Sequence, residues 1–206
     1  MAEGTVTVAR GDELGEAYRR RITEIYVRAF ADDFRAFSRD TTKLADAFEH
    51  MLLLERFHVA LLDGDPAGLA SLTEGDEQLF APDARRIRRY LGPLRGRLAT
   101  SVIRRWFMAV GDEARPGRGE IGFVATEPAF QGRGVATALL RHLIAQPGYD
   151  EFVLEDIKDT NAAALAVYAK HGFEIYRRRP QRFARAAGFT ELVSMRRAAG
   201  EAPEPG

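Results

Sequence analysis

Residues 120–137, EIGFVATEPAFQGRGVAT, form the stretch of the chain that most restricts its fold. The apolar run at 120–126 predicts a buried strand, and the spacing of apolar residues over 134–145 predicts a helix. Between the two, Gly132 and Gly134 allow the backbone to turn sharply and to approach a bound group closely. A helix that begins here presents unpaired N–H groups at the positive end of its dipole. The stretch therefore predicts either an anion site suited to phosphate or a tight turn without a ligand.

Two common phosphate-binding motifs do not fit this loop. A Walker loop requires Gly-Lys-Ser/Thr, which the chain lacks. A dinucleotide fingerprint requires a third glycine where Thr137 stands, although Glu155 lies about 20 residues from the loop, where that fingerprint places an acidic residue. That fold also needs several further parallel strands, and only one helix and two strands are predicted after Glu155. The pattern favours another class of site.

Outward from this stretch, the periodicity predicts an α+β domain. A strand, two helices and a hairpin precede it, and strands alternate with helices after it. Residues 74–118 interrupt the order with two further helices, at 82–91 and 94–110, separated at Gly92-Pro93 and followed by a loop. We expect one domain over 1–197, with an insertion at about 74–118 and a disordered tail at 198–206. The remaining predicted elements lie at 5–9, 12–30, 40–52, 57–63, 67–73, 152–155, 160–171, 173–178 and 189–195.

Two motifs resemble the GNAT superfamily of N-acetyltransferases. Residues 124–136 resemble its Gln/Arg-x-x-Gly-x-Gly/Ala signature, with Gln131, Gly134 and Ala136 at the three positions. Residues 161–173, NAAALAVYAKHGF, resemble its Asn…Leu-Tyr…Gly-Phe segment, in the family's order and at its separation. The resemblance implies the GNAT fold, a mixed, mostly antiparallel central sheet of about six to seven strands flanked by helices. The helical insertion before the fourth strand departs from the family, which usually has a short hairpin there.

The resemblance implies that acetyl-CoA is the cosubstrate. The backbone of the fourth strand would pair with the pantetheine arm, and the glycine loop would hold the pyrophosphate. Asn161 would contact the coenzyme or position its own helix. The residues assigned to the coenzyme in this way are Val124, Ala125, Thr126, Gln131, Gly132, Arg133, Gly134, Val135, Ala136, Thr137, Asn161 and Tyr168.

The implied reaction is direct attack of a primary amine on the acetyl group. It needs a base for the amine, donors such as the Val124 N–H for the oxyanion, and an acid for the leaving thiolate. Tyr168 matches the family's acid, although an aromatic beside Leu165 is also typical of a core position. For the base, Glu120 matches the histone-acetylating branch and Asp156 matches the ribosomal-protein N-terminal branch. Both are also typical of solvated strand ends, and some members have no dedicated base.

Strand alternation predicts that Glu155 and Asp156 face opposite sides of the sheet, so that only one of them faces the site. A non-catalytic acyl-CoA-binding or regulatory module on the same fold is the alternative to an enzyme. The acceptor amine is not readable from the sequence. Homodimers are common in the family, and the sequence leaves open whether this protein forms one.

Composition limits the other classes of function. The 206 residues carry 30 basic and 30 acidic side chains, so bulk charge does not favour nucleic acid. The absence of cysteine excludes disulfides and a cysteine acyl-enzyme, and the four histidines lack ligand spacing, so no metal is expected. No apolar run reaches the length of about 18 residues that a membrane span needs, and no signal-peptide pattern opens the chain. We expect a cytoplasmic protein, and the excess of arginine over lysine indicates a G+C-rich bacterial source.

Eight arginines lie between Asp83 and Trp106, in the insertion. They are typical of the solvated faces of two amphipathic helices. They also fit a wall of the acceptor pocket or a patch for an acidic partner. The sequence leaves these alternatives open.

Overall fold

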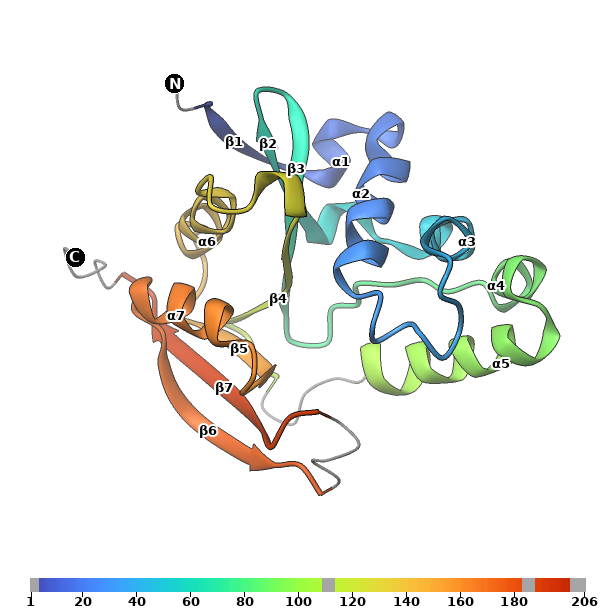
Figure 1. Ribbon diagram of the computed structural model, residues 1–206. Coiled ribbons are helices and arrows are strands. Elements are labelled where there is room, and N and C mark those ends of the chain that lie inside the picture. Colours follow the sequence, from blue (N-terminus) through green and yellow to red (C-terminus); the bar gives the residue numbers. More distant parts are fainter. Residues whose placement is uncertain (1–3, 109–113, 183–187, 201–206) are drawn as a thin grey trace.

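The computed structural model describes residues 4–108, 114–182 and 188–200 (Figure 1). Its centre is a seven-stranded sheet in the order β1-β2-β3-β4-β5-β7-β6. Neighbouring strands are antiparallel, except that β4 and β5 run parallel. This is the mixed, mostly antiparallel sheet that the resemblance implied. The strands are β1 Val6–Arg10, β2 Phe57–Leu62, β3 Asp65–Glu74, β4 Arg118–Thr126, β5 Glu151–Lys158, β6 Glu174–Pro180 and β7 Glu191–Ala198.

The helices cover the two faces of the sheet separately, as Figure 1 shows. The first core lies under α1 to α5 and is rich in aromatic side chains, including Tyr26, Phe34 and Phe48. The second core lies under α6 and α7 and is mostly aliphatic, with Leu139 and Leu143 at its centre. The α-helices are α1 Gly11–Leu14, α2 Glu16–Ala29, α3 Thr41–Phe48, α4 Ala84–Leu91, α5 Pro93–Val102, α6 Val135–Ile144 and α7 Ala162–Lys170.

The insertion between β3 and β4 is helical, as the sequence predicts. The carboxylate of Asp83 caps α4 by accepting hydrogen bonds from the N–H groups of Arg85 and Arg86, and Pro93 stands in the first turn of α5, where its missing N–H is not needed. Ile87 and Ile103 are buried in the first core. The insertion is therefore packed onto the domain rather than projecting from it.

Several element boundaries differ from the prediction. Gly15, at φ 82°, separates α1 from α2 where one helix over 12–30 was expected, because this backbone conformation ends a helix. The helix predicted over 94–110 leaves α geometry at Val102 and continues as a π-helical turn over Ile103–Phe107; residues 109–110 lie outside the described residues. Strand β7 includes Ala198, the first residue of the predicted tail, of which 201–206 are likewise not described.

None of the helices in the described part of the chain is long and apolar enough to cross a membrane.

Candidate active site

The site lies where β4 and β5 part. These parallel strands pair only through Arg118–Glu151, Gly119–Phe152 and Glu120–Val153. The other edge of β4 stays paired with β3 as far as Thr126. Beyond Glu120, no strand in the described ranges covers the β5 side of β4, so the backbone groups on that side are available to a ligand.

A β-bulge in β4 lies beside this open edge. The register with β3 shifts between Leu69 and Ser71, and Phe123 has φ 50°, which is rare for a bulky residue. Aromatic neighbours hold it there: the ring centroids of Tyr26 and Phe30 lie 5.4 and 5.2 Å from that of Phe123. The bulge reorients the backbone around the next residue, Val124, whose N–H the resemblance assigns to the oxyanion. A glycine inside a strand, here Gly122, is the sequence signal that indicates such a bulge.

The glycine loop begins α6 and leaves the first N–H groups of the helix without a side-chain cap. Gly132 and Gly134 have φ 74° and 79°, and Gly134 is the N-terminal cap residue of α6. No side chain caps this helix end and no acidic residue lies in its first turn. The first helical bond is donated by the Ala138 N–H to the Gly134 carbonyl, so the N–H groups of residues 135–137 have no intrahelical acceptor.

A side chain at either glycine would change this loop in two ways. A Cβ at Gly132 or Gly134 would meet no atom within 4 Å, so it would extend into the open space before the helix. The positive φ would also strain any L residue there. Nearby, Gln131 and Arg133 are exposed, and the Arg133 guanidinium lies 5.8 Å from the ring centroid of Phe130.

Tyr168 approaches from the second core. The residue is only 6% exposed and its ring packs 6.4 Å from that of Phe173. Burial raises the pKa of its hydroxyl to about 12, and the hydroxyl makes no hydrogen bond to any described residue. Asn161 caps α7, because its Oδ1 accepts a hydrogen bond from the Ala164 N–H. Asn161 is therefore the N-terminal cap of the helix that carries Tyr168.

Glu120 is the last residue of β4 paired with β5. It makes no hydrogen bond or ion pair with any described residue. Desolvation raises its pKa above the ordinary value, the negative charges of Glu155 and Asp156 add to the increase, and Arg118 opposes it. Its neighbour Ile121 belongs to the second core, so Glu120 lies on the opposite face of the sheet from Tyr168. The structure places the two on either side of the open strand edge without direct contact between them.

Glu155 and Asp156 do not follow strict alternation. A second bulge interrupts β5 between Leu154 and Ile157, and Asp156 has φ 53°. The strict alternation that predicted opposite faces for the two carboxylates is therefore broken at this point, and the negative charges of both raise the pKa of Glu120. Asp156 forms an ion pair with Arg179 at 2.7 Å, and its side chain is 48% exposed.

A side-chain network, called the apex network because it lies where β4 and β5 begin to part, holds Glu155 in place. Arg118, which is buried, donates a hydrogen bond to Glu155 at 3.0 Å and one to the Tyr176 hydroxyl at 2.7 Å. The Tyr176 hydroxyl and Arg177 also donate to Glu155. The network joins β4, β5 and β6 where the strands begin to part. No local sequence pattern predicts it, because its members are far apart in the chain.

Two histidines that the sequence leaves unrelated meet between β2 and α6. The Nδ1 atom of His58 lies 3.1 Å from the Nε2 atom of His142, and the Gln146 amide nitrogen lies 3.2 Å from that same Nε2. Burial lowers the pKa of His58 to about 4. Within the described ranges, no three His, Asp or Glu side chains gather in a way that could hold a metal ion.

Comparison with known proteins shows which family the chain resembles. The model of the acetyltransferase (GNAT) family matches residues 19–173. N-alpha-acetyltransferase RimI of Mycobacterium tuberculosis is 36% identical over 84 residues, which cover 40% of this chain and 50% of that relative. The match therefore spans half the length of this curated relative.

Solved structures agree on the fold. The yncA protein of Salmonella typhimurium, solved with acetyl-CoA, has a TM-score of 0.57 at 23% identity, over 98% of this chain and 99% of that one. The ribosomal-protein-S18-alanine N-acetyltransferase of Escherichia coli has a TM-score of 0.54 at 19% identity, over 97% of each chain. The family match covers three quarters of the chain, and the fold agrees with it. The chain therefore belongs to the GNAT acetyltransferase family.

Proposed function

We propose that this protein is an acetyl-CoA-dependent N-acetyltransferase that moves the acetyl group to a primary amine by direct attack. The observation that carries the proposal is the parting of β4 and β5 after Glu120, beside the glycine-capped start of α6. One face of this site offers an uncapped helix N-terminus, and the other offers an unpaired strand edge. The two suit the pyrophosphate and the amide-containing arm of one coenzyme.

The hydrogen-bonding groups at this site suit acetyl-CoA. The N–H groups of residues 135–137 have no acceptor within α6, and a pyrophosphate would satisfy them at the positive end of the helix dipole. The β5 side of residues 124–126 would pair with the amides of the pantetheine arm, as an added strand would. The acetyl-CoA bound to yncA, a protein of similar fold, supports this assignment.

Acetyl-CoA supplies an activated acyl group as a thioester. We assign to Glu120 the proton that the attacking amine loses as its nitrogen bonds to the acetyl carbon. The Val124 N–H would stabilise the oxyanion, and the bulge at Phe123 determines where that group lies. Tyr168 would donate a proton to the sulfur as the carbon–sulfur bond breaks. A pKa of about 12 keeps its hydroxyl protonated at neutral pH, as a donor must be.

The geometry favours Glu120 over Asp156 as the base. Asp156 is paired with Arg179, so one of its oxygens already accepts a charged hydrogen bond. Glu120 has no such partner among the described residues, and its raised pKa makes it a better proton acceptor than an ordinary glutamate. The absence of cysteine from the chain agrees with direct attack.

An α-amino group is the acceptor that we propose to test first. The reference pKa of an α-amino group is about 7.7–8.0, against about 10.4 for lysine, so a carboxylate needs less driving force to deprotonate it. The RimI relative is named an N-alpha-acetyltransferase and the Escherichia coli protein a ribosomal-protein-S18-alanine N-acetyltransferase, and these names support the same choice here.

The test is release of free thiol from acetyl-CoA with matched peptide acceptors. One peptide has a free N-terminus and an internal lysine, and its partner differs only in an acetylated N-terminus. We expect turnover with the first peptide alone. Turnover with both peptides would identify the lysine side chain as the acceptor instead. Acetyl-CoA binding without turnover on either these peptides or small amines would favour the non-catalytic module.

A further inference from the structure

The insertion carries a net positive charge, which acidic residues in the rest of the chain balance. Between residues 81 and 108 there are eight arginines and one acidic residue, Asp83, in a protein with no net charge. Within the described residues, the only ion pair that these arginines make is Arg86–Asp83 at 4.0 Å. Many described arginines outside the insertion do pair closely, as Arg56 does with Glu77 at 2.7 Å and Arg20 with Glu24 at 3.0 Å. The insertion therefore has more arginine charge without a nearby carboxylate than these segments have.

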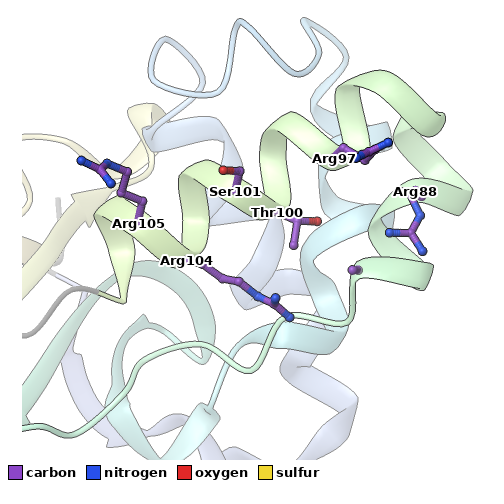
Figure 2. Close-up of a pocket in the computed structure, with 7 residues that line it drawn as sticks. Arg88, Arg97, Thr100, Ser101, Arg104 and Arg105 are labelled. Carbon is purple, nitrogen blue, oxygen red and sulfur yellow. The ribbon is translucent and has the colours of Figure 1, made fainter.

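Four of these arginines line one groove between α4 and α5, shown in Figure 2. The groove has a volume of about 570 Å³ and also contains the side chains of Thr100 and Ser101. The Thr100 hydroxyl is already used, because it donates to the Gly96 carbonyl at 2.7 Å. The charged lining comes from Arg88 of α4, from Arg97 of α5, and from Arg104 and Arg105 of the π-helical turn that follows α5.

An exposed leucine stripe runs along the same helix. Leu94 and Leu98 are 83% and 47% exposed, and they are among the few large apolar side chains on the surface of the described chain. Leu94, Leu98 and Ser101 are four and three residues apart, so they share one face of α5. Ser101 also lines the groove with Arg97, and with Arg104 and Arg105 of the following π-helical turn. Apolar and cationic side chains therefore lie next to each other on one helix surface.

We propose that the outer face of α5 and its groove bind an acidic segment of a partner protein. The carboxylates of that segment would pair with the arginines, whose forked donors suit carboxylates, and its apolar side chains would cover Leu94 and Leu98. Charge complementarity with an unpaired arginine groove is the argument for an acidic occupant. The leucines favour a protein over a nucleic acid, because exposed apolar side chains beside arginine are typical of protein interfaces. The proposal does not depend on which amine is acetylated.

The test measures the fluorescence anisotropy of a labelled helical peptide that carries one leucine stripe flanked by glutamates. Two control peptides replace the leucines with serine or the glutamates with glutamine, and oligouridylate serves as the nucleic-acid probe. The protein variants are Arg97→Gln/Arg104→Gln and Leu94→Ser/Leu98→Ser. The matched control, Arg141→Gln/Lys170→Gln, removes the same charge from exposed positions on α6 and α7.

We expect the acidic leucine peptide to bind, and either double variant in the insertion to weaken binding at least about tenfold. The control variant should bind as the unaltered protein does. Tighter binding of oligouridylate than of the peptide would overturn the proposal in favour of a nucleic-acid surface. Equal binding of the peptide by all protein variants would also overturn it. So would a result in which replacing the peptide glutamates abolishes binding but replacing the leucines, in peptide or protein, has no effect. Circular dichroism of each variant shows whether the insertion is still folded.

Discussion

Desolvation raises the pKa of Glu120 most, but charged neighbours also change it, and this second contribution can be tested by changing one of them. Glu155 raises the pKa of Glu120, while Arg118, which Glu155 holds at 3.0 Å, lowers it. Removing the charge of Glu155 takes away a negative neighbour and leaves Arg118 less neutralised. Both effects stabilise the ionised form of Glu120 and lower its pKa.

In Glu155→Gln, the rise of kcat/KM with pH should therefore occur at lower pH than in the unaltered enzyme. A base acts when it is deprotonated, so a lower pKa moves the ascending limb in that direction. The pH–rate profile of acetyl transfer is the measurement, with the remote, exposed Asp65→Asn as the control. An ascending limb that stays in place in Glu155→Gln would show that Glu120 is not the group that titrates.

Tyr168→Phe should lower kcat by about 10²-fold or more with little change in the affinity for acetyl-CoA. The substitution removes only a hydroxyl that makes no hydrogen bond to any described residue, so packing against Phe173 is kept. Steady-state kinetics and a coenzyme titration separate the two effects. Unchanged turnover would assign Tyr168 to the core alone, which is the other interpretation that its burial allows.

At the scale of elements, the sequence predicts the type and order of the strands and helices around the site, because apolar periodicity and glycine positions are local signals. Gly122 indicates a bulge in β4, but the sequence does not predict the positive φ of Phe123 and Asp156. The contacts of Phe123 with Tyr26 and of Asp156 with Arg179 join residues far apart in the chain. The apex network of Arg118, Glu155 and Tyr176 is unpredicted for the same reason. The motif residues of the loop were predictable, whereas the environment of the carboxylates was not.

The histidine pair couples β2 to α6 and should make the stability depend on pH. The buried His58 has a pKa of about 4, below its ordinary value, so the unfolded chain binds the proton more tightly. The free energy of unfolding should fall as the pH decreases from about 6.5 to about 4, by up to about 3 kcal/mol. Urea unfolding across this range measures it.

His58→Asn is the matched variant, and its stability should depend less on pH over the same interval. His142 also has a lowered pKa, through burial, and contributes in the same direction. Identical pH dependence in the variant and the unaltered protein would contradict a role for His58 and would place the effect on other groups.

For the whole molecule, ligand binding and folding are linked. The coenzyme would contact both the start of α6 and the edge of β4, and these positions are brought together only in the folded sheet. Acetyl-CoA at about 100 times its Kd should stabilise the fold by about 2.7 kcal/mol. For a chain of this size, that corresponds to a rise in Tm of about 5–10 °C. Differential scanning calorimetry with and without acetyl-CoA measures the shift, and an unchanged Tm would contradict binding to the native state.

The central claim is that the loop at Gly132–Gly134 is the coenzyme site of a GNAT enzyme. Isothermal titration of acetyl-CoA into the unaltered protein, Gly134→Val and Gly148→Val tests it most directly. Gly148 is the matched control, because it also has positive φ, at 93°, and open space around it, but lies in the turn after α6. We predict binding by the unaltered protein and by Gly148→Val, and loss of binding in Gly134→Val. Equal binding by all three, or no binding by the unaltered protein at millimolar acetyl-CoA, would contradict the account.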